Sequence, residues 1–254
     1  MLRLFQKSVL KQRKYDAIVS MLGPTDGLHC LDIGADNGVV SYLLRQRGGV
    51  WKSADLSEET VQVIRLMVGN EVYQIDGRSL PFESESLDRV VIVDLLEHVH
   101  TDREFIEDVY RVLKPGGVLV INVPHIKHSL LRKLRLAIGQ TDELHGHVRP
   151  GYSMETLTTL LDGKFVIEKG HTYCKFFSEF IDTLIRQAVA FVKRNKQGAS
   201  QKGHIVTDDD LHANQSMFKL YALIYPFVWV ISQLDKLLFF RSGYVLIVRA
   251  KATK

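Results

Sequence analysis

The sequence predicts an α/β fold in which helices cover both faces of a doubly wound, mostly parallel sheet. Its 254 residues suit one well-buried domain with an elaborated region. Its 46% hydrophobic and 24% charged residues are typical of a packed protein and exclude a disordered chain. Short apolar runs also alternate with helical patterns along the first half of the chain. We therefore expect one core that carries an insertion.

The first half of the chain accounts for most of the expected sheet. Residues 1–22 alternate basic and apolar residues at helical spacing, without the apolar core of a signal peptide, and predict an amphipathic helix. The expected strands are 28–33, 50–54, 72–75, 87–93 and 118–123. The expected helices are 39–47, 57–68 and 102–113. Residues 114–117, with sequence KPGG, are expected to be a turn before the fifth strand.

The second half predicts an insertion before a last strand. Helices are expected at 129–138 and 153–161, and a sixth strand at 164–173. Residues 176–240 predict a helical insertion, interrupted by a polar loop at 195–210, and 243–250 a closing strand. The predicted domains are thus a core of residues 1–175 and 241–254 and an insertion of residues 176–240.

A glycine-bearing turn follows the first strand, in the sequence LDIGADNG at residues 31–38. Open α/β sheets bind ligands at this edge, and Gly34 and Gly38 allow the backbone to approach a ligand closely. A dinucleotide fingerprint needs glycines at 34, 36 and 39, but the chain has Asp36 and Val39. The carboxylates of Asp32 and Asp36 would repel a pyrophosphate and favour a cationic ligand. The turn therefore predicts a ligand without phosphate.

Two more carboxylates follow strands that end at the same edge. Asp55 ends the second strand about twenty residues after the glycine turn, where a carboxylate accepts both ribose hydroxyls. Asp76, followed by Gly77, ends the third strand, where an aspartate accepts from an adenine amino group. Both positions indicate an adenosyl ligand.

The sequence resembles the class I S-adenosylmethionine-dependent methyltransferases that act on small molecules and lipids. The matching segments are LDIGADNG, ADLS, IDGRSLPF, LDRVVIVDLLEHV and VLKPGGVLVINVP. The resemblance implies a Rossmann-like, seven-stranded sheet with an antiparallel last strand, and S-adenosylmethionine as cofactor. It implies Asp32 and Gly34 near the methionine portion and Asp94 at the floor of the site. The cofactor-binding residues predicted in this way are Asp32, Gly34, Gly38, Asp55, Leu56, Asp76, Gly77 and Asp94. Asp36 departs from the family, which more often has glycine there.

Asp94, Glu97 and His98 lie at i, i+3 and i+4, on one face if the segment is helical. This resembles the metal-binding pattern of quinone-biosynthetic O-methyltransferases, but the same sequence is frequent in relatives that need no metal. We predict no metal and a role in loop packing. Because the methyl carbon is already activated, positioning supplies most of the catalysis.

A base is needed only where the acceptor must lose a proton. The predicted catalytic residues are His125, just after the fifth strand, and His145 in the HGHVR cluster of residues 145–149. Arg149 is a candidate for an anionic acceptor group.

The apolar run of residues 220–231 is too short for an ordinary membrane span. Strands of one sheet also flank it, so both its ends return to the same side. Residues 214–240 are therefore either a lid packed over the site or a membrane-interface helix with Trp229, Tyr221 and Tyr225 at head-group level. The interface alternative gains support from the basic residues between 193 and 202.

These observations predict an S-adenosylmethionine-dependent methyltransferase that acts at oxygen on a small-molecule, lipid-linked or glycan acceptor. The alternatives are an RNA or DNA methyltransferase, which the net charge of +4 supports, and a catalytically silent binding protein of the same fold. No Asp/Asn-Pro-Pro-aromatic sequence follows the fourth strand, so no nucleic-acid partner is expected. Two cysteines, Cys30 and Cys174, suit the reducing cytoplasm, with a peripheral contact at the inner membrane surface as a further expectation. The oligomeric state is left open.

Overall fold

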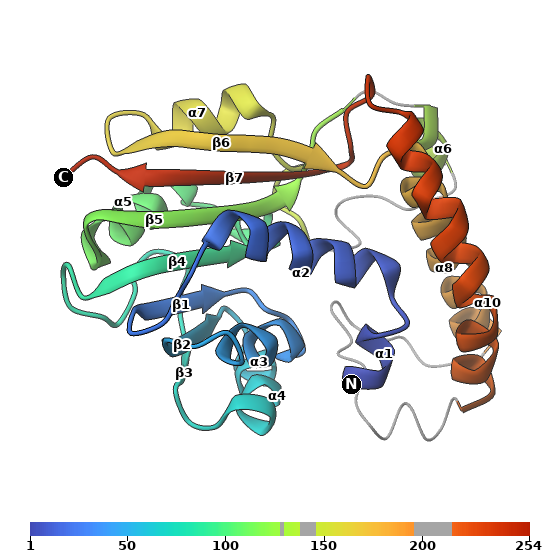
Figure 1. Ribbon diagram of the computed structural model, residues 1–254, viewed down its shortest axis with the longest axis horizontal. Helices are drawn as coiled ribbons and strands as arrows, with labels where there is room; N and C mark the ends of the chain where they lie inside the picture. Colours follow the sequence, from blue (N-terminus) through green and yellow to red (C-terminus); the bar gives the residue numbers. More distant parts are fainter. Residues whose placement is uncertain (128–129, 138–145, 196–214) are drawn as a thin grey trace.

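The computed structural model describes residues 1–127, 130–137, 146–195 and 215–254 and contains a seven-stranded sheet (Figure 1). Its strands are β1 (His29–Ile33), β2 (Val50–Asp55), β3 (Val72–Gln74), β4 (Leu87–Val93), β5 (Leu113–Pro124), β6 (Phe165–Tyr173) and β7 (Val245–Ala252). They lie in the order β3-β2-β1-β4-β5-β7-β6. The first five pair in parallel, and β7 is antiparallel to both β5 and β6. The predicted doubly wound sheet with an antiparallel last strand is confirmed.

The helices follow the predicted order with small shifts at their ends. The α-helices are α1 (Leu2–Phe5), α2 (Val9–Leu22), α3 (Val39–Arg45), α4 (Glu58–Val68), α5 (Asp102–Val112), α6 (Leu130–Ala137), α7 (Met154–Leu161), α8 (Phe176–Asn195) and α10 (Gln215–Gln233). The 3-10 helices are η1 (Leu96–His98) and η3 (Leu234–Leu237). The N-terminal segment forms two helices where the sequence predicted one. They separate at Ser8, whose hydroxyl caps α2 by accepting from the Lys11 N–H at 3.4 Å.

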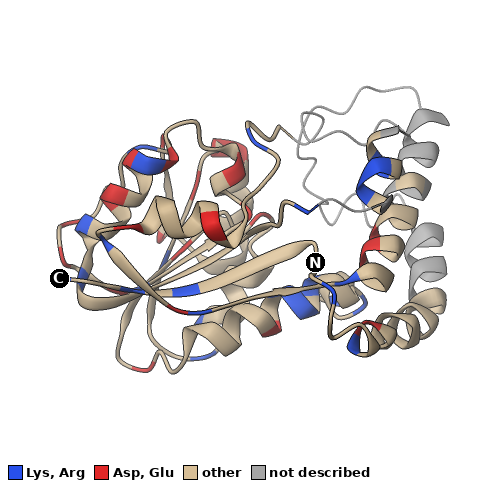
Figure 2. Ribbon diagram, turned by 90° about the horizontal axis from the view of Figure 1, so that it is seen from above, with Lys and Arg blue, Asp and Glu red and all other residues tan. Residues whose placement is uncertain are grey.

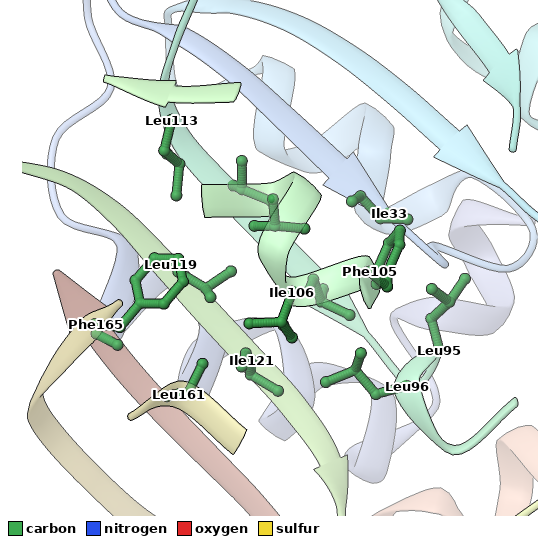
Figure 3. Close-up of a cluster of buried hydrophobic side chains, with 14 of the residues drawn as sticks. Ile33, Leu95, Leu96, Phe105, Ile106, Leu113, Leu119, Ile121, Leu161 and Phe165 are labelled. Atoms are coloured by element: carbon green, nitrogen blue, oxygen red, sulfur yellow. The ribbon is translucent and has the colours of Figure 1, made fainter. Parts of the chain in front are cut away.

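Apolar side chains pack against both faces of the sheet. On one face, Phe105 and Ile106 of α5 and Leu161 of α7 pack in one cluster with the inward residues of β4 and β5 (Figure 3). On the other face, Ile18 of α2 packs over β4, β5 and β7, and Leu44 of α3 packs over β2. Because the central strands are covered twice, they are apolar along nearly their whole length. Any polar residue in them is therefore held for a specific reason.

The KPGG segment is part of strand β5 instead of the turn that the sequence predicted. Leu113 pairs with Leu87, but Val118 pairs with Arg89, so the register shifts across residues 114–117. Gly116 has φ +68°, a left-handed conformation that glycine adopts without strain. The segment is a bulge that interrupts the pairing without ending the strand.

Helices α8 and α10 lie in the chain between β6 and β7 and form, with α6, a layer beyond the carboxyl ends of the strands (Figure 1). Arg13 of α2 joins this layer to the sheet. Its guanidinium donates to the Ser178 hydroxyl at 2.6 Å, the Asp235 carboxylate at 3.0 Å and the Ser232 carbonyl at 2.6 Å. Among the described residues, no helix is long and apolar enough to span a membrane. The division at residues 176 and 240 remains a prediction.

Candidate active site

The turn after β1 is pressed between the ends of two neighbouring strands. Gly34 has φ +82°, and its N–H donates to the Ala54 carbonyl at 3.0 Å. A Cβ on Gly34 would lie 2.4 Å from the Val93 carbonyl oxygen and 2.8 Å from the Leu95 Cβ. Only glycine therefore allows the turn to lie this close to the end of β4.

Asp36 and Gly38 shape the rest of the turn. Asp36 has φ +55°, so it adopts the left-handed conformation that explains why glycine is usual at this position. Its exposed carboxylate lies 4.0 Å from the Lys11 ammonium of α2. Gly38 has φ +75° and precedes α3, with Ile64 of α4 directly beside it. The departure from the family pattern is thus accommodated by local strain at one exposed residue.

Asp32 is fully buried and supports the turn from below. Its carboxylate accepts from the hydroxyls of Ser41 and Ser53, the latter at 2.8 Å, and pairs with Arg45 at 3.3 Å. Burial raises the pKa of Asp32, and Arg45 and the two hydroxyls oppose that rise. These bonds join β1, β2 and α3. Direct contact of Asp32 with a cofactor remains a prediction.

Asp55 and Asp76 lie at the carboxyl ends of β2 and β3 and differ strongly in environment. Asp55 is buried, and one carboxylate oxygen accepts from the Ser57 N–H at 3.2 Å. Burial raises the pKa of Asp55 to about 6, against the opposing effect of that hydrogen bond. Asp76 is exposed and accepts from the N–H groups of Arg78 and Ser79 at 2.8 and 2.9 Å, which lower its pKa. Its carboxylate thus stabilises the loop after β3.

Leu56 and Gly77 lie against each other between these two carboxylates. A Cβ on Gly77 would lie 3.2 Å from a methyl group of Leu56 and 3.5 Å from Val99. Gly77 also has φ +77°, so a side chain there would be strained as well as crowded. The three residues form an apolar wall at the edge of the sheet. Such a wall suits the face of a flat ring.

Asp94 follows β4 and is the centre of a polar network. It has φ +46°, and its carboxylate forms an ion pair with Lys14 of α2 and accepts from the Asn122 amide at 2.7 Å. Asn122 in turn accepts from the Tyr173 hydroxyl at 2.5 Å. Burial alone would lower the pKa of Lys14, but the Asp94 carboxylate outweighs it and the net shift is upward. Lys14 is therefore a fixed ammonium at the floor of the predicted site.

The predicted grouping of Asp94, Glu97 and His98 on one helical face is wrong. Asp94 precedes the short η1, and its left-handed backbone turns its carboxylate towards Lys14. Instead His147 joins Glu97 and His98, with potential donor atoms within 4.8 Å of one another. Burial, and next the charge of Asp94, raise the pKa of Glu97 well above its usual range, which favours a neutral carboxyl group. The prediction of no metal stays a prediction.

Of the two predicted bases, His125 lies at the predicted edge and His145 lies outside the described residues. Nδ1 of His125 is 2.9 Å from the Gly243 carbonyl oxygen. Since a carbonyl only accepts, Nδ1 carries a proton, and in the neutral imidazole the lone pair is then on Nε2. The Arg149 guanidinium is occupied by the Asp102 carboxylate, the Tyr152 hydroxyl and two backbone carbonyls. These bonds give Arg149 a structural task and leave its proposed anion-binding role without support.

Sequence reasoning missed Lys14, Asn122 and Tyr173 around Asp94. Asn122 carries a detectable signal, because it is the one amide within an apolar strand that is buried on both faces. Lys14 carries none. It lies among other basic residues of an amphipathic helix, and only the packing of α2 across the sheet brings it to Asp94.

Comparison with known proteins relates this fold, and residues 31–121 within it, to methyltransferases. A family model described as a methyltransferase domain matches residues 31–121, from β1 through most of β5. Residues 31–121 are therefore similar to a methyltransferase domain. The solved S-adenosylmethionine-dependent methyltransferase from Mesorhizobium loti has a TM-score of 0.57 and 18% identity, covering 94% of this chain and 97% of its own. At that identity the likeness shows the fold alone.

Curated methyltransferases are similar to part of this chain. A demethylmenaquinone methyltransferase of Tropheryma whipplei is 33% identical over 108 residues, which are 41% of this chain and 45% of the relative. A ubiquinone biosynthesis O-methyltransferase of Idiomarina loihiensis is 32% identical over 102 residues, covering 37% and 42% of the two chains. The chain thus spans less than half the length of these curated relatives. The family model ends at residue 121, so the layer of α6, α8 and α10 lies outside it.

Proposed function

We propose that this protein transfers the methyl group of S-adenosylmethionine to an oxygen atom of a small-molecule acceptor. One observation carries the proposal: carboxylates follow β2, β3 and β4 beside a glycine turn that leaves no room for side chains. A cationic nucleoside is attracted to such an edge, whereas a phosphate-bearing one is repelled. The named relatives are methyltransferases, which supports the same reading.

The residues are assigned tasks by their positions. We assign Asp55 to the two ribose hydroxyls, because it is buried at the end of β2 with one oxygen bonded to Ser57. Leu56 and Gly77 would form the wall beside the adenine ring, and Asp76 would accept from its amino group. Asp94 would face the cationic methionine portion. Gly34 and Gly38 allow the turn to approach the cofactor, and Asp32 holds that turn in place.

The chemistry requires placement more than proton transfer. The acceptor oxygen must approach the methyl carbon in line with the leaving sulfur. When that oxygen carries a proton, Nε2 of His125 is positioned to take it, because Nδ1 is bonded to the Gly243 carbonyl. S-adenosylmethionine supplies the electrophilic carbon.

The acceptor is proposed to be lipid-linked and to meet the protein at the inner face of the membrane. Two of the relatives carry the names of quinone-biosynthetic enzymes, and the layer of α8 and α10 exposes apolar side chains close to the predicted site. The two buried, unpaired thiols of Cys30 and Cys174 suit a reducing cytoplasm. The layer of α8 and α10 lies outside residues 31–121, the region that the family model matches. We therefore propose that this layer determines which acceptor binds.

The proposal is tested by binding and by transfer. Calorimetry should detect S-adenosylmethionine and its demethylated product, and no NAD. Incubation with methyl-labelled S-adenosylmethionine and a fractionated extract should then label the lipid fraction. Label in the nucleic-acid fraction would show that the acceptor is a nucleic acid and not a lipid. If S-adenosylmethionine did not bind, the proposed reaction would be wrong.

Cofactor affinity should fall as the pH drops through about 6, because Asp55 has a pKa raised to about 6 and is protonated below it. A protonated carboxyl accepts less well from two hydroxyls. Calorimetry across this range measures the change, and Asp55→Asn provides the control. In that variant the pH dependence should flatten. A variant that keeps the full dependence would assign it to another group.

Replacing Lys14 with methionine should strengthen S-adenosylmethionine binding. The substitution removes the ammonium that pairs with Asp94 and leaves the carboxylate for the cationic ligand. Since both partners are partly exposed, we expect a gain of about fivefold and a loss of stability below about 1 kcal/mol. Calorimetry and urea unfolding measure the two effects. Weaker binding would mean that Lys14 holds the site open.

A further inference from the structure

Helix α10 presents an apolar stripe to solvent. Leu223, Phe227 and Val230 are spaced by four and three residues, so they share one face of α10, and Leu234 follows at the start of η3. Their exposed fractions are 70%, 69%, 57% and 38%. The opposite side of α10 contacts α8 and α2. A soluble surface rarely carries such a continuous stripe without a partner.

The stripe continues along η3 and into the loop that follows it. Leu237, Phe239 and Phe240 are 69%, 84% and 69% exposed, and the two phenyl rings pack edge to face at 5.6 Å. Phe240 and Phe176 of α8 line one shallow hollow, and Phe176 stacks on Phe180 at 6.3 Å. We call the seven residues Leu223, Phe227, Val230, Leu234, Leu237, Phe239 and Phe240 the apolar face.

Among the described residues that follow position 222 and precede β7, the exposed charges all have one sign. Within residues 223–244 the exposed charged side chains are Lys236 and Arg241. The acidic residue there, Asp235, is buried and paired with Arg13 at 3.0 Å. On α8, Glu179 is likewise buried and paired with Lys127 at 2.8 Å. In Figure 2 much of the described ribbon of this layer is tan, interrupted by blue and red bands. Positive charge thus borders an apolar surface from which carboxylates are withdrawn.

We propose that the apolar face docks on an anionic phospholipid bilayer. Phenyl and leucyl side chains enter the boundary between head groups and acyl chains, and Lys236 and Arg241 meet the phosphates. A second copy of the chain fits less well, because a twofold contact would bring the same two cations of both copies together without an exposed carboxylate between them. The protein lies on the bilayer without crossing it.

This docking deepens the proposed function and rests on it only for the identity of the acceptor. The layer of α8 and α10 stands at the edge of the sheet where the candidate site lies (Figure 1). A lipid-linked acceptor would therefore reach the site from the bilayer along the α10 side. The surface itself is independent of methyl transfer.

The test is co-sedimentation with vesicles. The full chain should bind vesicles of phosphatidylglycerol mixed with phosphatidylcholine, less at high salt, and bind phosphatidylcholine alone weakly. The double variant Phe239→Ser/Phe240→Ser should lose at least about tenfold in affinity. The double variant Lys236→Gln/Arg241→Gln should lose roughly fivefold for each charge, on the anionic vesicles only. Leu66→Ser is the matched control, since Leu66 is 86% exposed on α4, away from the apolar face.

Each alternative result has a defined meaning. Unchanged binding in both double variants, or an equal loss in Leu66→Ser, overturns the docking surface. A concentration-dependent dimer that Phe239→Ser/Phe240→Ser dissolves, without vesicle binding, replaces the bilayer with a second copy. Calorimetry with S-adenosylmethionine should be unchanged in these variants. A chain that binds vesicles but no S-adenosylmethionine would overturn the proposed function and leave the docking intact.

Discussion

Replacing Gly34 with alanine is expected to destabilise the fold by about 2 to 5 kcal/mol and to abolish cofactor binding. The left-handed backbone, at φ +82°, costs an alanine about 1 to 2 kcal/mol. The new Cβ would also lie 2.4 Å from the Val93 carbonyl oxygen, and relief of such crowding costs about 1 to 3 kcal/mol more. Since the turn must move away from β4, the ends of β1 and β4 separate at the site. Urea unfolding and calorimetry measure the two losses.

Gly69 provides the control that separates backbone strain from crowding. It has φ +89°, but a Cβ there would meet no atom within 4 Å. Gly69→Ala should therefore cost only the conformational part, about 1 to 2 kcal/mol, and leave cofactor binding intact. Equal losses at the two glycines would show that the close approach to β4 contributes nothing.

Replacing Asp55 with alanine is expected to weaken S-adenosylmethionine binding by about 5- to 150-fold. The substitution leaves two buried ribose hydroxyls without an acceptor, at a cost of about 1 to 3 kcal/mol. The fold should tolerate the change, because burial raises the pKa of Asp55 and its charge does not favour the folded state. Calorimetry measures the affinity, and urea unfolding checks the fold.

Asp88→Ala is the matched comparison for Asp55→Ala. Asp88 is a carboxylate near the other end of the sheet, where it accepts from the His29 N–H and the Lys114 ammonium, each at 2.9 Å. Its removal should lower stability and leave cofactor affinity unchanged. If Asp55→Ala also left the affinity unchanged, the ribose assignment would have to be abandoned.

The sheet could be predicted from the sequence because its strands are short apolar runs bounded by turn residues. Residues 87–93 were predicted with the bounds that the structure has, since an apolar run follows the polar residues 83–86. The KPGG segment was misjudged because glycine and proline mark a turn and a bulge alike. The break at Ser8 was missed because a short polar interruption does not disturb the helical spacing around it.

The candidate site could be predicted only where its residues follow strands. Asp55, Asp76 and Asp94 were found because each ends an apolar run, and parallel strands bring their carboxyl ends together. Lys14 could not be found, since its contact with Asp94 depends on how α2 crosses the sheet, 80 residues away in the chain. The grouping of Asp94 with Glu97 and His98 failed because one left-handed residue redirected a side chain.

Arg13 and Lys14 are consecutive residues of α2 with unrelated partners. Successive side chains on a helix diverge by about 100°, so Arg13 reaches Asp235 and Ser178 while Lys14 reaches Asp94. A single turn of α2 therefore joins Asp94 at the end of β4 to the outer layer of helices. A rotation of α2 that moves Lys14 away from Asp94 must also move Arg13 relative to Asp235. Binding of a ligand at Asp94 and the position of the helical layer are therefore coupled through α2.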